Sequence, residues 1–299
     1  MIRDMTDGST IYDWERDIAP YLGNMQPVEG GYSLAKRGIV EINGGVKVFV
    51  KIAEGKTTKK WLAKEIKTYK KLNEAGYTYI PKLLSHNDTH SAMAIEYLQE
   101  ASFENIWDND KLSAILEAQK ELKKYKTLFV DDSDFTLGSV VGLDSKWSAI
   151  LQPGNVEIIN NKFMKLGVDV IFMTKQLETF HQDIKDWKIR DETLVHQDIR
   201  ADNFGYDPKT KKGKLVDWNW ICIGDESLDR TPLFVNMYIS GFDPYKLHPE
   251  TYDRNMLIYL VSFWLERILT GNEDSGEPEF KRRVAQAKSV KACIELINR

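Results

Sequence analysis

The order of apolar and polar residues divides the chain into a strand-rich first third and a mostly helical remainder. Residues 32–42 and 46–53 have the composition of strands, and the Asn-Gly-Gly between them at 43–45 is typical of a tight hairpin because such residues tolerate positive φ. In the second run valines alternate with lysines and a phenylalanine, which is the period of a half-buried strand. Two further strands are predicted at 81–84 and 91–98.

An amphipathic helix is predicted between these pairs of strands, at residues 58–74, with Gly76 as its terminator. Its polar side is rich in lysine, so the helix should bury only one face. The apolar residues expected on that face are Trp61, Leu62, Ile66, Tyr69 and Leu72.

Helical spacing dominates the rest of the chain. Helices are predicted at 111–128, 156–187 and 249–299 (with a break at 271–278), and short strands at 193–195 and 214–216. Segment 129–155 has no clear period, and a segment of that length is more often functional or mobile than a simple connection. This order predicts an α+β fold in which a small β-rich lobe, residues 1–98, is hinged to a larger α-rich lobe, residues 99–299.

Composition and charge exclude several classes of protein. A formal net charge of −4 and a pI near 5.8 argue against a nucleic-acid partner, which normally selects a basic surface. The most apolar stretch, 256–269, contains Glu266 and Arg267 and is shorter than the ~20 residues of a membrane span, so no membrane partner is expected. Two cysteines give no disulfide framework, and the N-terminus lacks a secretory pattern, so we expect a cytoplasmic protein.

The sequence His-Gln-Asp-Ile-Arg-Ala-Asp-Asn at 196–203, together with Asp217, is the strongest candidate for a site. Phosphoryl transfer needs a carboxylate that orients the acceptor, ligands for a metal ion on the phosphates, and cations near the phosphate oxygens. Asp198 is the candidate base or orienting group, and Arg200 is expected to reach the transferred phosphate. Asn203 and Asp217 carry the oxygen ligands that Mg²⁺ prefers.

These motifs resemble the catalytic and metal-binding segments of the aminoglycoside phosphotransferase and choline kinase family, whose members are related to protein kinases. The resemblance rests on the pattern H-x-D-x-x-x-x-N and on Asp217-Trp218, which begins fourteen residues after Asn203. Residues 223–229 also resemble the family's G-D-P-x-x-D-L stretch. The resemblance covers roughly residues 28–235, and it implies a protein-kinase-like fold with ATP or another nucleoside triphosphate and Mg²⁺ as cofactors.

The resemblance extends to the candidate phosphate-binding lysine. Lys51 ends a strand that looks like the V-A-I-K of kinases, whose lysine contacts the α- and β-phosphates. Glu65, fourteen residues later, lies on the predicted helix and is expected to form the ion pair that holds Lys51 in place. The alternative is that both are surface charges on elements crowded with lysine.

A phosphate-covering loop is predicted just before the hairpin, at Gly30, Gly31 and Ser33. Glycines let backbone N–H groups approach an anion closely, and Ser33 adds a hydroxyl group. The full glycine-rich pattern of protein kinases is absent, so a plain tight turn is the alternative.

The expected hinge between the lobes is segment 95–98. Backbone groups of Glu96 and Leu98 there would pair with the edge of adenine, which makes the identity of their side chains uninformative. Phe49 is expected on the same strand face as Lys51, where it would narrow the adenine pocket or else only pack in the core.

The sequence therefore predicts a small-molecule kinase that phosphorylates a hydroxyl or amine, for example of an aminoglycoside or of choline. Segment 129–155 and the helices after Asp229 are expected to select this acceptor. A protein kinase is disfavoured because Trp-Asn, not Phe-Gly, follows Asp217 and no Ala-Pro-Glu occurs downstream. Gln197 departs both from the protein-kinase pattern, which has arginine there, and from the aminoglycoside phosphotransferase pattern, which has glycine. A non-catalytic nucleotide-binding protein is the third alternative, which the complete set of candidate residues disfavours, and the oligomeric state stays open.

Overall fold

The computed structural model describes residues 12–28, 35–137 and 146–299. The chain forms two compact units, each built from two stretches of sequence. The first unit is Met1–Phe135 with Thr193–Ile223, and the second is Thr136–Glu192 with Gly224–Arg299. The lobe boundary expected at residue 98 stays a prediction.

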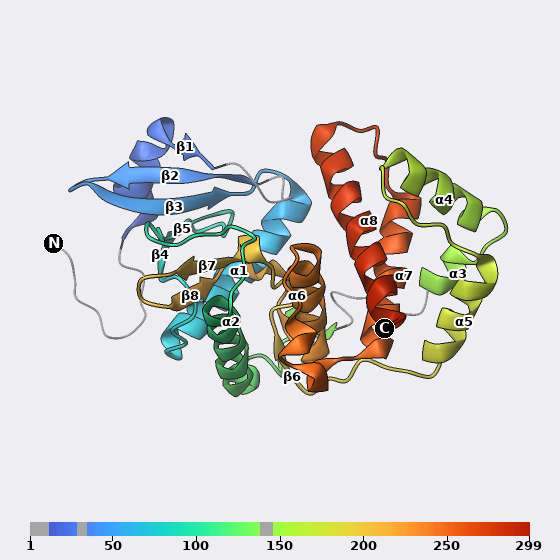
Figure 1. The fold of residues 1–299 in the computed structure, drawn as a ribbon. Helices are drawn as coiled ribbons and strands as arrows, with labels where there is room; N and C mark the ends of the chain where they lie inside the picture. Colours follow the sequence, from blue (N-terminus) through green and yellow to red (C-terminus); the bar gives the residue numbers. More distant parts are fainter. Residues whose placement is uncertain (1–11, 29–34, 138–145) are drawn as a thin grey trace. The chain divides into compact units, whose positions relative to one another are not determined.

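The first unit contains a five-stranded antiparallel sheet with the strand order β1-β2-β3-β5-β4 (Figure 1). The strands are β1 (Gln26–Pro27), β2 (Lys36–Ile42), β3 (Val46–Ile52), β4 (Leu83–His86) and β5 (Ala92–Glu96). The predicted hairpin is confirmed, and Gly44 and Gly45 at its turn have φ angles of 85° and 75°. Lys51 pairs in register with Arg37 on one side and Met93 on the other, so it lies in the middle of the sheet.

The predicted amphipathic helix is α1 (Lys56–Glu74), and it ends before Gly76, whose φ is 80°. Its buried apolar residues are Leu62, Ile66, Tyr69 and Leu72. The expectation that Trp61 is buried with them is wrong, because its side chain is 38% exposed. Trp61 lies at the margin of the buried stripe and gains partial cover from Trp220, whose ring centroid is 6.2 Å away.

Further helices and strands of the first unit come after the sheet in the sequence. They include α2 (Asn109–Leu122), a 3₁₀ helix at Lys123–Leu128, and the strands β6 (Thr193–Val195), β7 (Phe204–Asp207), β8 (Lys212–Leu215) and β9 (Cys222–Gly224). β7 and β8 form an antiparallel hairpin, and β6 pairs with β9. The helix predicted at 111–128 is confirmed over most of its length, with a 3₁₀ end. Strand β7 was not predicted.

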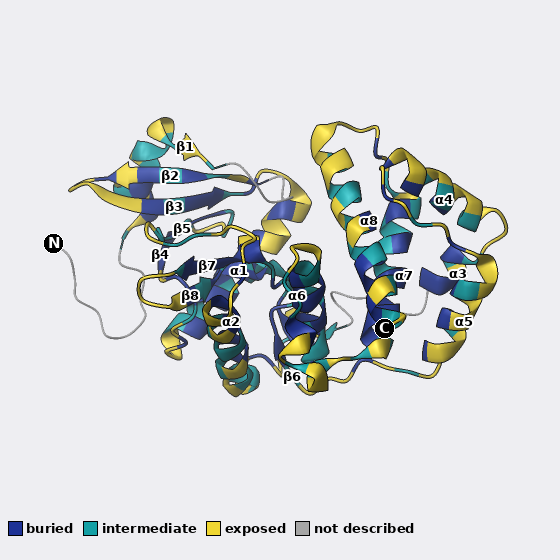
Figure 2. Cartoon of the chain, in the orientation of Figure 1, coloured by how far each residue is buried: buried dark blue, intermediate teal, exposed yellow. Residues whose placement is uncertain are grey.

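The second unit is helical, and α7 lies at its centre (Figure 1). Its helices are α3 (Lys146–Ile150), α4 (Asn155–Lys165), α5 (Thr174–Ile184), α6 (Ser227–Ile239), α7 (Arg254–Thr270) and α8 (Glu277–Ile297). α7 packs against all five of the others, and its residues 256–262 are all buried (Figure 2). Among the described residues, no helix has both the length and the apolar character needed to cross a membrane.

The single helix predicted at 156–187 is wrong, because the chain there forms α4 and α5 with a connection between them. Gly167, with a φ of 68°, ends the first of them, and the amide of Val168 donates back to the carbonyl of Phe163. A residue with positive φ cannot continue a right-handed helix, and glycine adopts that conformation without steric cost.

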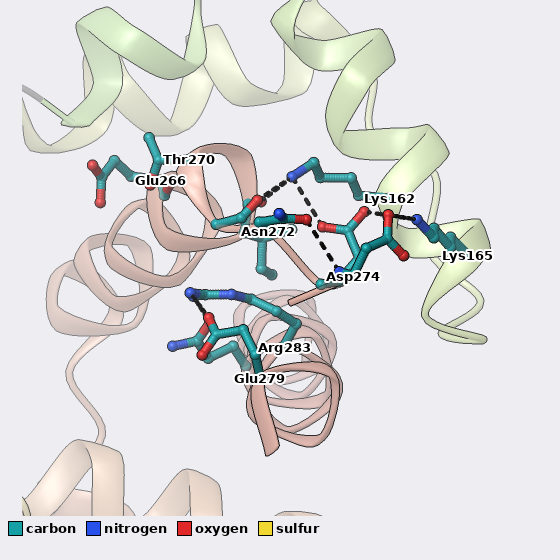
Figure 3. Close-up of polar contacts among 12 residues, drawn as sticks. Lys162, Lys165, Glu266, Thr270, Asn272, Asp274, Glu279 and Arg283 are labelled. Atoms are coloured by element: carbon teal, nitrogen blue, oxygen red, sulfur yellow. Dashed lines mark hydrogen bonds and ion pairs between the residues drawn. The ribbon is translucent and has the colours of Figure 1, made fainter. Parts of the chain in front are cut away.

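A lysine of α4 holds the end of α7 in the second unit (Figure 3). The ammonium of Lys162 donates to the carbonyls of Ile268 and Gly271, at 3.0 and 2.6 Å, and to Glu273 at 3.1 Å. The last carbonyls of a helix have no partner within the helix, and a cation there also suits the negative end of the helix dipole. Lys162 therefore satisfies the C-terminus of α7 from a neighbouring helix.

Candidate active site

The centre of the candidate site is a buried lysine between two carboxylates, all in the first unit. Lys51 Nζ lies 2.7 Å from Glu65 Oε2 and 2.7 Å from Asp217 Oδ1. β3 supplies the lysine, α1 supplies Glu65, and Asp217 follows β8. The expected Lys51–Glu65 ion pair is therefore present, and the alternative of two surface charges does not hold, since Lys51 and Glu65 are only 7% and 2% exposed.

Lys51 and Asp217 stabilise each other's charge, whereas burial raises the pKa of the Glu65 carboxyl. Burial alone would lower the pKa of Lys51, but the carboxylates of Asp217 and Glu65 outweigh it and raise that pKa. Burial likewise opposes ionisation of Asp217, and Lys51 overcomes this and lowers the pKa of Asp217. The lysine thus stays a cation and Asp217 stays a carboxylate. Asp217 also has a φ of 65°, a left-handed conformation that is rare outside glycine and is often found at functional sites.

The loop that follows β6 is anchored by a buried histidine. His196 is fully buried, its Nε2 lies 3.0 Å from the carbonyl of Val216, and its Nδ1 accepts from the amide of Asp198. Burial lowers the pKa of His196 to about 4, so the ring is neutral and can both donate and accept. His196 therefore ties the start of the loop to the residue just before Asp217.

Asp198 and Asn203 are in direct contact within the loop. The amide nitrogen of Asn203 donates to the backbone carbonyl of Asp198 at 2.8 Å and to its carboxylate at 3.0 Å. The amide of Val216 in turn donates to the carbonyl of Asn203, which places the loop beside the strand that leads to Asp217. Burial raises the pKa of Asp198 to about 7, against the opposing effect of Arg200.

Arg200 lies against the same carboxylate. Its Nε is 3.1 Å from Asp198 Oδ1 and 3.3 Å from Asp202 Oδ1. Its side chain is 26% exposed, so the guanidinium is partly open to solvent. Gln197, between His196 and Asp198, has a φ of 67°, and its side chain accepts a weak hydrogen bond from the thiol of Cys222.

The donor atoms of Asn203 and Asp217 fit a hard cation. Their hydrogen bonds engage the amide nitrogen of Asn203 and one carboxylate oxygen of Asp217, so the amide oxygen of Asn203 and the second carboxylate oxygen of Asp217 suit Mg²⁺. Within residues 12–28, 35–137 and 146–299, no group of three or more histidine, cysteine or carboxylate side chains could hold a metal ion alone. Two protein ligands agree with Mg²⁺, which is commonly bound by one or two side chains together with substrate phosphates.

The expected phosphate-covering residues Gly30, Gly31 and Ser33 lie outside the described residues. Phe49 is half-buried in β3, in register between Ile39 and Ile95. Its influence on nucleotide preference stays a prediction.

The expected hinge residues occupy the end of β5 and the chain just after it. The amide of Glu96 donates to the carbonyl of Lys82, and its carboxylate lies 2.6 Å from Lys214 of β8. The expectation that backbone groups of Glu96 and Leu98 pair with the edge of adenine stays a prediction. The link to Lys214 was not anticipated, because the sequence carries no sign of which lysine would meet Glu96.

Asp225, two residues before α6, is only 5% exposed and has partners within the second unit. It accepts hydrogen bonds from Arg190 and from the amide and hydroxyl of Ser227. Trp147 is also buried and lies against the ring of His181. In the second unit these residues have structural contacts of their own.

No protein-family model matches the sequence, and no curated protein matches it at a significant level. Solved structures do match. The choline kinase LicA from Streptococcus pneumoniae has a TM-score of 0.55 and 15% identity, covering 91% of this chain and 93% of that one. The gentamicin complex of APH(2")-IIa has a TM-score of 0.52 and 14% identity, with coverages of 89% and 93%. The amicoumacin kinase hAmiN has a TM-score of 0.52 and 11% identity, with coverages of 93% and 89%.

The chain thus has the protein-kinase-like fold of small-molecule kinases, with a small antiparallel β-sheet part and a helical part. More particularly, its fold is that of the choline kinases and aminoglycoside phosphotransferases. The predicted fold class and the resemblance to this family are confirmed at the level of the fold.

Proposed function

We propose that the protein is an ATP-dependent phosphotransferase that moves the γ-phosphate of a nucleoside triphosphate to a hydroxyl or amine of a small molecule. The observation that carries this proposal is the contact of Lys51 with both Glu65 and Asp217, beside a loop in which Asp198 touches Asn203. Chain segments far apart in sequence meet there, and each supplies a group that phosphoryl transfer needs.

Each group has a separate role in the proposed reaction. Lys51, held by two carboxylates, donates to the α- and β-phosphates. Asp198 accepts or aims the proton of the acceptor, and a carboxylate whose pKa is raised to about 7 is suited to a general base near neutral pH. Arg200, on the same side of the loop, places positive charge near the transferred phosphoryl group.

Asn203 and Asp217 would hold Mg²⁺, which neutralises charge on the phosphates when it is bound. Two hydrogen bonds support this pairing. Val216, the residue before Asp217, donates its amide to the carbonyl of Asn203, and its own carbonyl lies 3.0 Å from Nε2 of His196. The metal site therefore depends on the same backbone contacts that shape the catalytic loop.

The acceptor is proposed only by class. The matching structures are described as a choline kinase, a complex with gentamicin and a complex of an amicoumacin kinase. Choline, gentamicin and amicoumacin all carry hydroxyl groups. We therefore propose a polar small molecule with such a group as the acceptor. A non-catalytic nucleotide-binding protein with the same fold is the competing function.

The test is Mg²⁺-dependent consumption of ATP in the presence of a panel of amino alcohols, sugars and amine-containing antibiotics. The wild type should phosphorylate at least one member, and Asp198→Ala should lower the rate by a factor of 10² or more. Asp202→Asn is the matched control, because Asp202 lies in the same loop and also contacts Arg200 but has no proposed chemical role. If the wild type binds ATP and phosphorylates nothing, the non-catalytic function stands instead.

A further inference from the structure

A glycine of β7 is packed directly against the segment that follows the expected hinge. A methyl group added at Gly205 would lie 2.7 Å from Phe103 Cζ, 3.0 Å from Leu98 Cδ1 and 3.2 Å from the Cβ of Ala101. Real carbon atoms do not approach so closely, so these side chains fill the space that any larger residue at 205 would need. The Phe103 ring therefore sits where the side chain of a β7 residue would otherwise be.

Two other contacts fix the same segment to the β7–β8 hairpin. Ser102 and Tyr206 exchange backbone hydrogen bonds of 2.8 and 3.0 Å, one residue away from Phe103 and from Gly205. Lys214, which is opposite Gly205 in the hairpin, forms the ion pair with Glu96. The position of the Phe103 ring relative to Glu96 and Leu98 is thus set by backbone and charge contacts, not by the ring alone.

The glycine that contacts this ring is close to the proposed metal ligand. β7 begins at Phe204, directly after Asn203, so the Cα atoms of Asn203 and Gly205 are at most about 7 Å apart. A nucleotide whose phosphates meet Asn203 and whose base meets Leu98 would have to run past Gly205.

The exposure of Phe103 differs from that of an ordinary core residue. Its ring is 37% exposed even though one edge is packed on Gly205 and Leu98. A partly exposed aromatic ring beside polar backbone groups is what proteins use to bind nucleobases, which stack or pack on it while their edges are hydrogen-bonded.

We infer that Phe103, seated on Gly205, is the platform on which the nucleotide base packs while the Glu96 carbonyl and the Leu98 amide bind its edge. This inference rests on the proposed function, because it assumes that a nucleoside triphosphate is the phosphate donor. It adds a base-binding residue that the sequence motifs do not contain. It also explains why residue 205 is a glycine, since a side chain there would displace the ring.

Binding of the base and binding of the phosphates can be measured separately by calorimetry. Binding of ATP and of inorganic tripolyphosphate, both with Mg²⁺, is measured for the wild type, Phe103→Ala and Gly205→Ala. Phe103→Ala should raise the Kd for ATP on the order of tenfold, as for loss of one base-stacking contact. Gly205→Ala should change it in the same direction, because the added methyl group collides with the ring. The Kd for tripolyphosphate should stay unchanged in both.

Phe280→Ala is the matched control, because Phe280 lies in α8 of the second unit and is also 37% exposed. Its affinity for ATP should equal that of the wild type. Thermal unfolding establishes that each variant is folded, and Phe103→Leu, expected to lose less affinity than Phe103→Ala, replaces the latter if that protein does not fold.

Unchanged ATP affinity in the folded Phe103 variant overturns the inference, and so does an equal loss for ATP and tripolyphosphate. If this happens while Asp198→Ala still abolishes phosphoryl transfer, the inference alone fails. If the wild type binds neither ligand, the proposed function fails and the inference with it.

Discussion

The ammonium of Lys51 donates a 2.7 Å hydrogen bond to the carboxylate of Asp217, which lies 166 residues further along the chain. The same ammonium binds Glu65 of α1, so one atom joins the centre of the sheet, a helix and the segment after β8. A buried charge is tolerated only when it is paired and hydrogen-bonded. This lysine is therefore a structural joint of the first unit as well as the proposed phosphate ligand.

Replacing the lysine should separate these two roles. Lys51→Met leaves two carboxylates without a cation, and removing one partner of a buried ion pair costs about 3–5 kcal/mol in the free energy of unfolding. Lys51→Met combined with Glu65→Gln removes one of the uncompensated charges and should regain part of that stability. Neither variant should consume ATP. Chemical denaturation and an ATP assay check both statements, and a double variant that regains activity together with stability would contradict the phosphate-binding role.

Lys146 of α3 is predicted to weaken the second unit at neutral pH. It is 6% exposed, lies over the rings of Tyr259 and Phe263, and its pKa is lowered to about 7, by burial first and by Arg267 second, against a small opposing effect of Glu266. Burial of this amine lowers the free energy of unfolding, and burial of a neutral side chain at the same place would not. We expect Lys146→Met to raise the free energy of unfolding at pH 7 by about 1–3 kcal/mol, after the loss of the ring contacts is allowed for.

The pH dependence of this gain has a definite sign. The amine is protonated in the unfolded chain below its ordinary pKa of 10.5 and is neutral in the folded chain above about 7. The cost to the wild type therefore grows as the pH falls from 10.5 to 7, so the advantage of Lys146→Met should shrink as the pH rises from 7 toward 10. An advantage that is constant over this range would contradict the burial argument.

Substitution of Lys162 is expected to lower the free energy of unfolding more than substitution of an ordinary surface lysine. Its removal leaves the carbonyls of Ile268 and Gly271 without their lysine donor. It also takes one of two lysines from the carboxylate of Glu273, which is only 8% exposed. Lys162→Met should therefore lower the free energy of unfolding by about 1–3 kcal/mol. Lys165→Met is the control, since Lys165 also contacts Glu273 but is itself 46% exposed, and its nearer partner, Asp274, is 68% exposed (Figure 3). Equal losses of stability in the two variants would exclude a special role for Lys162.

His196 should make the protein sensitive to acid. Burial lowers its pKa to about 4, so it is neutral when folded and takes up a proton from about pH 6.5 downward when unfolded. Stability from this residue is complete above pH 6.5 and is lost as the pH falls toward 4, at up to about 1.4 kcal/mol per pH unit. The advantage of the wild type over His196→Gln in urea unfolding should accordingly shrink between pH 6.5 and 4.5. A difference that does not change with pH would argue against a buried neutral ring.

The parts of the site that could be predicted are those whose residues lie close together in the sequence. The distance in sequence between Asp198 and Asn203, and between Lys51 and Glu65, constrains their relative position because each pair lies on one loop or on adjoining elements. The hairpin at Gly44 was predictable for a similar reason, since its turn requires positive φ. Backbone geometry over a few residues decides such features.

Features that depend on contacts between distant segments could not be predicted. Trp61 has the helical spacing expected for burial, but it lies at the margin of the buried stripe, where Trp220 covers it only in part. The pairing of Glu96 with Lys214 and the packing of Phe103 on Gly205 likewise depend on how the β7–β8 hairpin meets the end of β5. The break at Gly167, inside the single helix predicted at 156–187, was also missed.

The central claim is that Asp198, Asn203, Asp217 and Lys51 form one phosphotransfer site. The most direct test uses ATP labelled in its γ-phosphate, Mg²⁺ and the acceptor panel, and follows where the label goes by mass spectrometry. We predict that the wild type moves the label onto a small molecule, that Asp198→Ala and Asp217→Asn do not, and that Asp202→Asn still does. Label that reaches the acceptor equally with Asp198→Ala, or that never leaves ATP with the wild type, would contradict the claim.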